Sequence, residues 1–539
     1  MADGQMKPST HTPIESSPEI AETDNAEITT TLGEDNTDVE SQRSGAGLVV
    51  VYLEGWRLHV LTIAFDTSSR SSWIVTSYLL AYTGFLIILS KFSDIFGRKP
   101  LIVLTVFLFT VFSAACGAAQ NLVDLIILRA FQGIGGGGIY TLVFVISSQM
   151  VPMEGYAALS GILSSAYALS AVLGPILGGL ISDHTTWRWV FLLNAPAGTI
   201  ALGMIFLAMP ASFPHQSTSS DSIRSKLNKV TIWRFDFLGA FLLLGASILF
   251  VSAVEEGGTE YSWKSPVIIA LLPLSTVLWI VFFFWEKYVS GRREAQEPVL
   301  PWRLIKDRFA MGFLLNALFG GAVFIPVVIN VPQRFQVVNN VSAFGASWRL
   351  LALMLCTPLG SAVSGFMIQK LKFPTLHIFL VAALLQTIGL ALMGSLSTSQ
   401  LEVSSAQYAY QVILGLGIGL SLSSVIIATP TVVKEKDTAV FMGALAQARI
   451  LGGSIGLAIC SNILNGKIKS ASSFLSPQQL HGLLESAQNA KKLPPSFEKM
   501  VRGVYAEGYN QEMQALTAFG GAAVLATLLM WEKKPRKMQ

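Results

Sequence analysis

The sequence Ser90-Lys91-Phe92-Ser93-Asp94-Ile95-Phe96-Gly97-Arg98-Lys99-Pro100 forms a short charged bridge between two long apolar runs. Unpaired charges are costly in hydrocarbon, so this bridge must reach a membrane surface. Short cytoplasmic loops are enriched in Lys and Arg, and this loop holds three such bases. Gly97 allows a tight turn that a side chain would hinder. The bridge therefore predicts a cytoplasmic loop between two membrane helices.

The composition indicates a protein with many membrane helices. Of 539 residues, 52% are hydrophobic and 13% are charged, which is far more apolar than a soluble domain. The net charge of +4 comes largely from bases at helix ends, so it reports topology rather than nucleic-acid binding. Cys116, Cys356 and Cys460 lie in apolar runs without metal-ligand spacing. We expect no disulfide and no metal site.

Thirteen clear apolar runs have about the ~20 residues that a helix needs to cross a ~30 Å hydrocarbon core. A weaker run, Gly45 to Phe65, would be a fourteenth. The sequence thus predicts an all-α membrane protein of about fourteen helices, the first atypical. The clear runs are 73–89, 101–118, 122–149, 157–181, 188–209, 237–254, 266–286, 309–331, 343–368, 373–395, 406–429, 439–464 and 513–531.

Charge patterns assign the ends and the loops. Residues 1–44 are acidic and poor in large apolar residues, which predicts a disordered cytoplasmic tail. Bases gather in alternate short loops on the side of the bridge, so both ends should be cytoplasmic if all fourteen runs span. Residues 466–512 would form an external loop, since long loops translocate regardless of charge. Residues 532–539 would be a short basic cytoplasmic tail.

The bridge resembles the loop between the second and third helices of the major facilitator superfamily, whose pattern is Gly-x-x-x-Asp-(Arg/Lys)-x-Gly-Arg-(Lys/Arg). Ser90 replaces the first Gly of that pattern and Ile95 the usual base. The resemblance implies that the loop gates motion rather than contacting substrate. A basic turn after an ordinary membrane helix is the alternative. The matching residues are Asp94, Gly97, Arg98 and Lys99.

The run 122–149 contains a segment, Leu128 to Gly138, that is similar to the family's Arg-x-x-Gln-Gly-x-Gly motif. Arg129 stays charged at any working pH and cannot itself carry a proton. With Gln132, it would tune a nearby acid or hold a closed state. The alternative is a structural Arg whose donors are satisfied by backbone carbonyls and Gln132.

The run 157–181 presents a face of small residues at helical spacing, and a proline within it predicts a kink. Such faces are common in membrane bundles, where they allow close packing. Their order here resembles a motif of proton-coupled antiporters, with Ser170 in place of one Gly, and that resemblance favours export over uptake. The residues concerned are Gly161, Gly174, Pro175, Gly178 and Gly179.

Polar residues within other runs are candidates for a cavity wall. Asn194 lies in Trp187 to Gly198, and Gln447 and Arg449 lie in Gln447 to Gly456; both segments resemble stretches of the fourteen-helix branch of the family. Asn316, Gln386 and Gln411 are further polar candidates. The alternative for each amide is an interhelical hydrogen bond.

A weak internal repeat suggests the domain organisation. The loop Gln369 to Pro374 is similar to the charged bridge but lacks its acid, as expected of a second half. We predict helical halves at 45–210 and 309–531, joined by residues 211–308, which contribute two extra central helices. The resemblance to the fourteen-helix drug:proton antiporter branch, especially its fungal members, runs from Trp73 to Trp531.

No Walker loop, zincin motif or nucleophile elbow is present, and Gly135 to Gly138 lack a following Lys-Ser/Thr. We therefore expect neither an enzyme nor direct ATP drive. The resemblance implies export of small amphipathic drugs or toxins by alternating access, driven by a proton gradient without a cofactor. The alternatives are a siderophore or other metabolite carrier, and a pseudo-carrier or sensor that does not transport.

The expected partners are a small-molecule substrate and the lipid bilayer, with no nucleic acid. We expect a monomer in the plasma membrane, with the vacuolar membrane as the alternative.

The first run departs most from the family. Relatives carry an Asp-x-Thr signature there, but its Asp would fall near Tyr52 in this chain. Glu54 lies two residues away and could pair with Arg57 at i+3. Either Glu54 has become the proton carrier, or Gly45 to Phe65 is a degraded helix that inserts inefficiently. The second interpretation is favoured, because three polar side chains in one short run oppose insertion.

Overall fold

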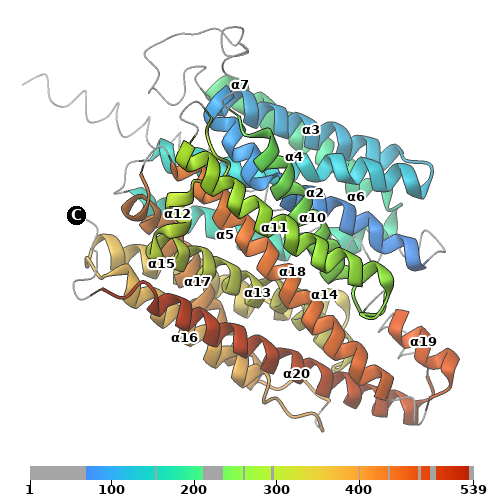
Figure 1. Ribbon diagram of the computed structural model, residues 1–539. Coiled ribbons are helices and arrows are strands. Elements are labelled where there is room, and N and C mark those ends of the chain that lie inside the picture. Colours follow the sequence, from blue (N-terminus) through green and yellow to red (C-terminus); the bar gives the residue numbers. More distant parts are fainter. Residues whose placement is uncertain are drawn as a thin grey trace, which may run out of the picture.

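The computed structural model describes residues 68–151, 155–209, 235–258, 261–292, 296–399, 401–434, 437–470, 475–485 and 493–532. These residues form a bundle of long α-helices (Figure 1). Two isolated bridges, Phe235–Glu297 and Gly257–Tyr261, are the β pairings within the described ranges. The prediction of an all-α fold is confirmed.

The first half of the bundle packs around α4. Helices α2 and α3 both contact it, and α7 covers α3. Asn121 caps α4 by accepting a hydrogen bond from the backbone nitrogen of Asp124 at 2.8 Å. Gly97 alone separates α2 from α3, and its φ of 102° is a conformation that a Cβ would strain. The helices are α2 (Ser68–Phe96), α3 (Arg98–Ala118), α4 (Leu122–Met150), α5 (Tyr156–His184), α6 (Arg188–Leu192) and α7 (Asn194–Ala208).

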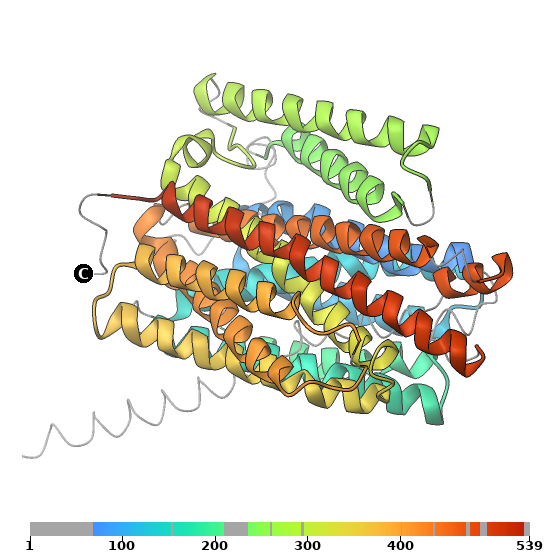
Figure 2. The ribbon, with the colours of Figure 1, turned by 90° about the horizontal axis from the view of Figure 1, so that it is seen from below.

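Two central helices, α10 (Phe237–Glu256) and α11 (Pro266–Arg292), form a hairpin along one edge of the bundle (Figure 2). Helix α10 contacts α2 of the first half and α18 of the second half, and α11 packs on α10. The short helix α12 (Trp302–Lys306) leads from this hairpin into the second half. The hairpin therefore touches both halves.

The second half has a turn that matches the charged bridge. Lys372, between α15 and α16, has a φ of 52°. The turn after α15 therefore contains a residue with positive φ, as the turn after α2 does at Gly97. The helices are α13 (Arg308–Val337), α14 (Ala343–Arg349), α15 (Leu351–Gln369), α16 (Thr375–Met393), α17 (Ala406–Val432), α18 (Thr438–Ser470), α19 (Pro477–Glu485) and α20 (Pro495–Leu528).

Eleven helical spans in the described chain are long and apolar enough to cross a membrane. They correspond to eleven of the thirteen clear runs, and the other two, 157–181 and 513–531, lie in α5 and α20. The run 188–209 forms one apolar span, Arg188–Ala208, because Leu193 between α6 and α7 keeps a helical backbone, with φ of −56° and ψ of −30°. The predicted run Gly45 to Phe65 and the predicted tails lie outside the described residues, apart from Glu532. The count of fourteen stays a prediction.

Residues 466–512 are largely helical where they are described. Helix α18 continues to Ser470, α19 follows, and α20 begins at Pro495. Tyr505 and Tyr509 are buried there beside Leu483 and Val501. The side of the membrane on which this segment lies stays a prediction.

The two halves meet along α18 and α5. Helix α18 contacts α2 and α4, and α5 contacts α14, α15 and α17. One buried apolar cluster contains side chains of both halves, including Ile87 of α2 and Phe441 of α18. Below, the loop side is the side of the bundle where Gly97 lies, and the far side is the opposite one.

Candidate functional site

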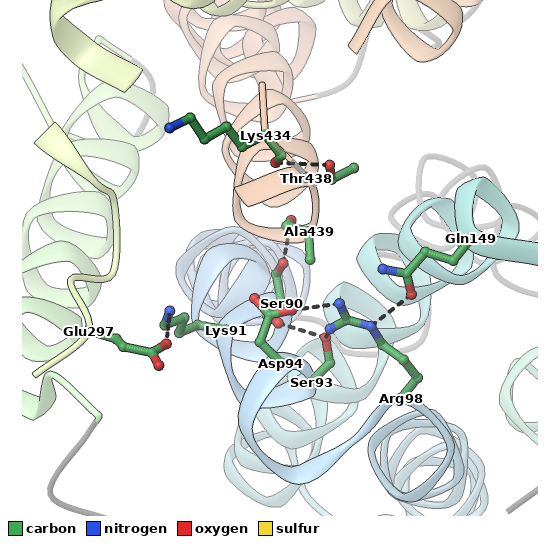
Figure 3. A network of polar contacts seen from close by, with 10 residues as sticks. All are labelled: Ser90, Lys91, Ser93, Asp94, Arg98, Gln149, Glu297, Lys434, Thr438 and Ala439. Atoms are coloured by element: carbon green, nitrogen blue, oxygen red, sulfur yellow. Dashed lines mark hydrogen bonds and ion pairs between the residues drawn. The ribbon is translucent and has the colours of Figure 1, made fainter. Parts of the chain in front are cut away.

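The charged bridge forms a network of polar contacts at the end of α2 (Figure 3). Asp94 Oδ1 lies 2.5 Å from a terminal nitrogen of Arg98. Arg98 Nε donates to Gln149 Oε1 at 3.1 Å, and its other terminal nitrogen donates to Ser93 Oγ. Arg98 is 7% exposed. It therefore joins the end of α2 to the end of α4 through charge-assisted hydrogen bonds.

The bridge reaches the second half through Ser90. Ser90 Oγ donates to the carbonyl oxygen of Ala439, near the start of α18, at 2.5 Å. A Cβ at Gly443, one turn later, would lie 2.9 Å from the Cβ of Ser90 and 3.3 Å from the Cα of Ile87. Helices α2 and α18 can approach this closely because small residues line the contact. The loop side of the interface is therefore closed in this structure.

A segment after α11 contacts both halves on the loop side. We call residues 296–306 the strap. Lys91 Nζ of α2 lies 2.6 Å from Glu297 Oε2 of the strap (Figure 3). Arg303 binds both carboxylate oxygens of Asp437, just before α18, at 2.8 and 2.5 Å. One short stretch of chain thus carries an ion pair to each half.

Lys99, the last base of the bridge, contacts the end of α7. Its Nζ donates to the carbonyl oxygen of Phe206 at 3.2 Å and to that of Met209. The last carbonyls of a helix have no partner within the helix. Lys99 therefore caps α7 and stays within the first half.

Arg129 is fully buried in α4, with 0% of its surface exposed. Its Nε donates to the carbonyl oxygen of Ile74 in α2 at 3.1 Å, and a terminal nitrogen donates to Gln132 Oε1 at 2.7 Å. The guanidinium carbon lies 4.2 Å from the centre of the Tyr78 ring. Gln132 Nε2 continues the network to Ser113 Oγ at 2.6 Å. Arg129 and Gln132 are brought together, and they link α2, α3 and α4 toward the far side.

Helix α5 lies against the second half. Ser164 Oγ and Ser361 Oγ of α15 are 2.7 Å apart, and both residues are buried. Gly174 is buried, whereas a Cβ at Gly161 would meet open space. Pro175, Gly178 and Gly179 lie within the bounds of α5, but their surroundings fall outside the described residues. A kink at the proline stays a prediction.

The four candidate cavity residues lie on three helices, α7, α13 and α18. Asn316 Nδ2 donates to Thr527 Oγ1 of α20 at 3.0 Å. Gln447 Nε2 donates to Ser247 Oγ of α10 at 2.8 Å. Asn194 is buried at the start of α7, and Arg449 is partly exposed on α18. The first two therefore join helices, and a shared cavity wall stays a prediction.

Several buried charged residues were not singled out from the sequence. Asn330 Nδ2 of α13 donates to Glu512 Oε2 of α20 at 2.8 Å, and Arg334 donates to Asn510 Oδ1 at 2.6 Å. Asn330 and Arg334 are four residues apart on one helix, so they share a face. That spacing at the end of an apolar run was the available signal. Glu54 lies outside the described residues, so its role stays a prediction.

These features define a class of protein: a polytopic membrane transporter, whose two helical halves meet at a charged loop. The family model described as Major Facilitator Superfamily matches residues 58–255. The "MFS-type transporter FPY5" of Fusarium mangiferae is 44% identical, with 94% of this chain and 89% of that protein covered. The chain belongs to the major facilitator superfamily, and it is a transporter rather than an enzyme.

Two further proteins are similar over most of their length. The "MFS-type efflux pump MFS1" of Arthroderma benhamiae is 28% identical, with 93% of this chain and 95% of that protein covered. The crystal structure of the human organic anion transporter MFSD10 (TETRAN) matches with a TM-score of 0.57 and 14% identity, covering 91% of this chain and 98% of that one. At that identity, the second likeness concerns the fold alone.

Our first prediction concerns the loop network. Removing one member of a buried charge pair costs about 2 kcal/mol or more, so we expect Asp94→Asn and Arg98→Ala to slow transport by roughly tenfold or more. Both proteins should still fold and insert, because the loop lies at a helix end. Transport rates at matched membrane levels measure this, with Asp124→Asn, an exposed carboxyl on the far side, as control. Unchanged rates in both variants would remove the gating role.

The second prediction concerns Arg129. We expect Arg129→Ala to abolish transport and Arg129→Lys to restore only part of it, because an ammonium is a point charge and does not reproduce the planar guanidinium. The guanidinium bonds Ile74 and Gln132 while stacking on Tyr78. Thermal unfolding of both purified variants separates lost function from lost structure. Full transport in the Ala variant would reduce Arg129 to a packing role.

The third prediction concerns the close approach of α2 and α18. Leu at Gly443 would overpack the contact, at a typical cost of about 1–3 kcal/mol, and shift the population toward a loop-side-open state by roughly 5- to 150-fold. Spin labels at Pro100 and Lys434, both exposed on the loop side, measure the separation. Gly466→Leu, on the same helix, is the control, since a Cβ there would meet nothing within 4 Å. An unchanged distance distribution in Gly443→Leu would show that this contact does not hold the loop side closed.

Proposed function

We propose that this transporter exports small amphipathic organic compounds in exchange for protons. The observation that carries the proposal is the interface between the halves. It joins α2 to α18 through Ser90 and Ala439, and α5 to α15 through Ser164 and Ser361. Such single contacts between packed halves can break and reform one side at a time, which alternating access requires.

Export rather than uptake is supported by the sequence of α5 and by a relative. The glycine pattern of α5 resembles that of proton-coupled antiporters, and the Arthroderma relative, similar over 93% of this chain, is named an efflux pump. Arg129 holds a fixed positive charge inside the first half, where it would act on a proton-binding acid rather than carry the proton. We further propose that the protein works as a monomer in the plasma membrane.

A siderophore or other metabolite carrier is the second candidate function. The same helical architecture would serve it, since a substrate between the halves near the middle of the membrane is common to both. The two candidates differ in which compound is moved, so one flux experiment separates them.

The fourth prediction is the test of this function. Inside-out vesicles containing the full chain should accumulate ethidium, an amphipathic cation, when their interior is made acidic. A protonophore should abolish the accumulation, and vesicles with Arg129→Ala should lack it. A ferric hydroxamate chelate is tested in parallel under the same gradient.

Three outcomes are distinct. Gradient-dependent accumulation of ethidium alone supports drug export. Accumulation of the ferric chelate alone contradicts drug export and favours the siderophore carrier. Equal uptake with and without the gradient, for every compound of a wider panel, contradicts proton exchange.

A further inference from the structure

Glu255 lies at the far-side end of α10, where the central hairpin meets both halves. Its Oε1 accepts a hydrogen bond from Ser454 Oγ of α18 at 3.4 Å. Thr76 of α2 lies close to this carboxyl. Thr76 and Ser454 are 5% and 7% exposed, whereas Glu255 is intermediate in exposure. One carboxyl therefore lies between a buried hydroxyl of each half and keeps some contact with its surroundings.

Hydroxyl partners suit a carboxyl that gains and loses a proton. A hydroxyl can donate to a carboxylate, and it can also accept from a protonated acid. Glu256, the next residue of α10, is 4% exposed. Two adjacent carboxylates repel each other when both are ionised. A hydroxyl partner can therefore bond the Glu255 carboxyl in both protonation states, and it does so more strongly when the carboxyl is ionised.

The other buried carboxyls that we have described have different partners. Asp94 is paired with Arg98 inside the first half. Glu512 accepts from Asn330 inside the second half. Each of these partners belongs to the same half as its carboxyl.

Two more acids lie in the hairpin on the loop side. Asp236 accepts from Trp285 Nε1 at 2.9 Å and from the backbone nitrogen of Gly239 at 2.9 Å. Glu286 accepts from the backbone nitrogen of Val299 at 3.2 Å. These two acids are bonded by nitrogen donors. Among the acids described, Glu255 is thus the one that lies between hydroxyls of both halves.

We propose that Glu255 is a proton-binding site of the transport cycle, and that its protonation state is coupled to the separation of α2 from α18 on the far side. The proposal rests on the proposed function of proton exchange. An ionised Glu255 accepts from Thr76 and Ser454 and holds the two helices together. A proton bound on the carboxyl removes one of its acceptor positions and weakens this link. The proton binds to the carboxylate and is later released, so the O–H bond of the carboxyl is the one covalent bond that forms and breaks.

The fifth prediction tests proton binding without any substrate. Infrared difference spectra of the purified full chain in lipid, between about pH 5 and about pH 9, report protonated carboxyl groups through their C=O band. We expect Glu255→Gln to lose one such band that Glu402→Gln, an exposed control, keeps. Ser454→Ala keeps the acid and should move the pH at which that band appears. An identical spectrum in Glu255→Gln and the control would overturn the proton site.

Coupling is tested in proteoliposomes with ethidium as the probe. We expect Glu255→Gln to reduce gradient-driven accumulation to the level without a gradient, while the exposed control Glu402→Gln keeps the accumulation of wild type. Gradient-driven accumulation that persists in Glu255→Gln would overturn the coupling role. If the wild type accumulates nothing under a gradient, the proposed function fails and the coupling role with it. Loss of the infrared band in Glu255→Gln would then still establish the proton site.

Discussion

Unpaired charge cannot lie in an apolar bundle, and this constraint governs the polar architecture of the protein. Buried cations described in the bundle are hydrogen-bonded to specific acceptors: Lys91 and Arg98 to the carboxylates of Glu297 and Asp94, and Arg129 and Arg334 to the neutral amides of Gln132 and Asn510. Breaking such a pair leaves a desolvated charge, whereas the intact pair contributes little net stability. The pairs therefore act mainly by fixing which helices lie together.

The fold could be predicted from the sequence because its signals are local. Apolar runs mark helices, since a membrane helix satisfies all its backbone hydrogen bonds internally. The role of Gly97 as a one-residue turn followed from its place between charges, and its positive φ agrees with that.

The candidate site could be predicted only in part. Arg129 and Gln132 lie three residues apart on one helix, so their contact follows from helical spacing. The pairs Lys91–Glu297 and Arg303–Asp437 join residues far apart in sequence, and no local pattern indicates them. Glu255 was missed for a related reason: in the sequence, an acid at the end of an apolar run cannot be told from an ordinary solvated residue at a helix end. The two hydroxyls beside it come from distant helices.

The strap sets a length limit on the movement of the halves. Glu297 and Arg303 are separated by six residues, which span at most about 20 Å when fully extended. If the loop side opens so that Lys91 and Asp437 move further apart than the extended strap can reach, one of the two ion pairs must break. Each pair has one half-exposed or partly exposed partner, with side-chain exposures of 34% for Glu297 and 48% for Arg303. Pairs of this kind are weak and are screened by salt. The ionic strength on that side of the membrane thus sets how readily an ion pair of the strap breaks.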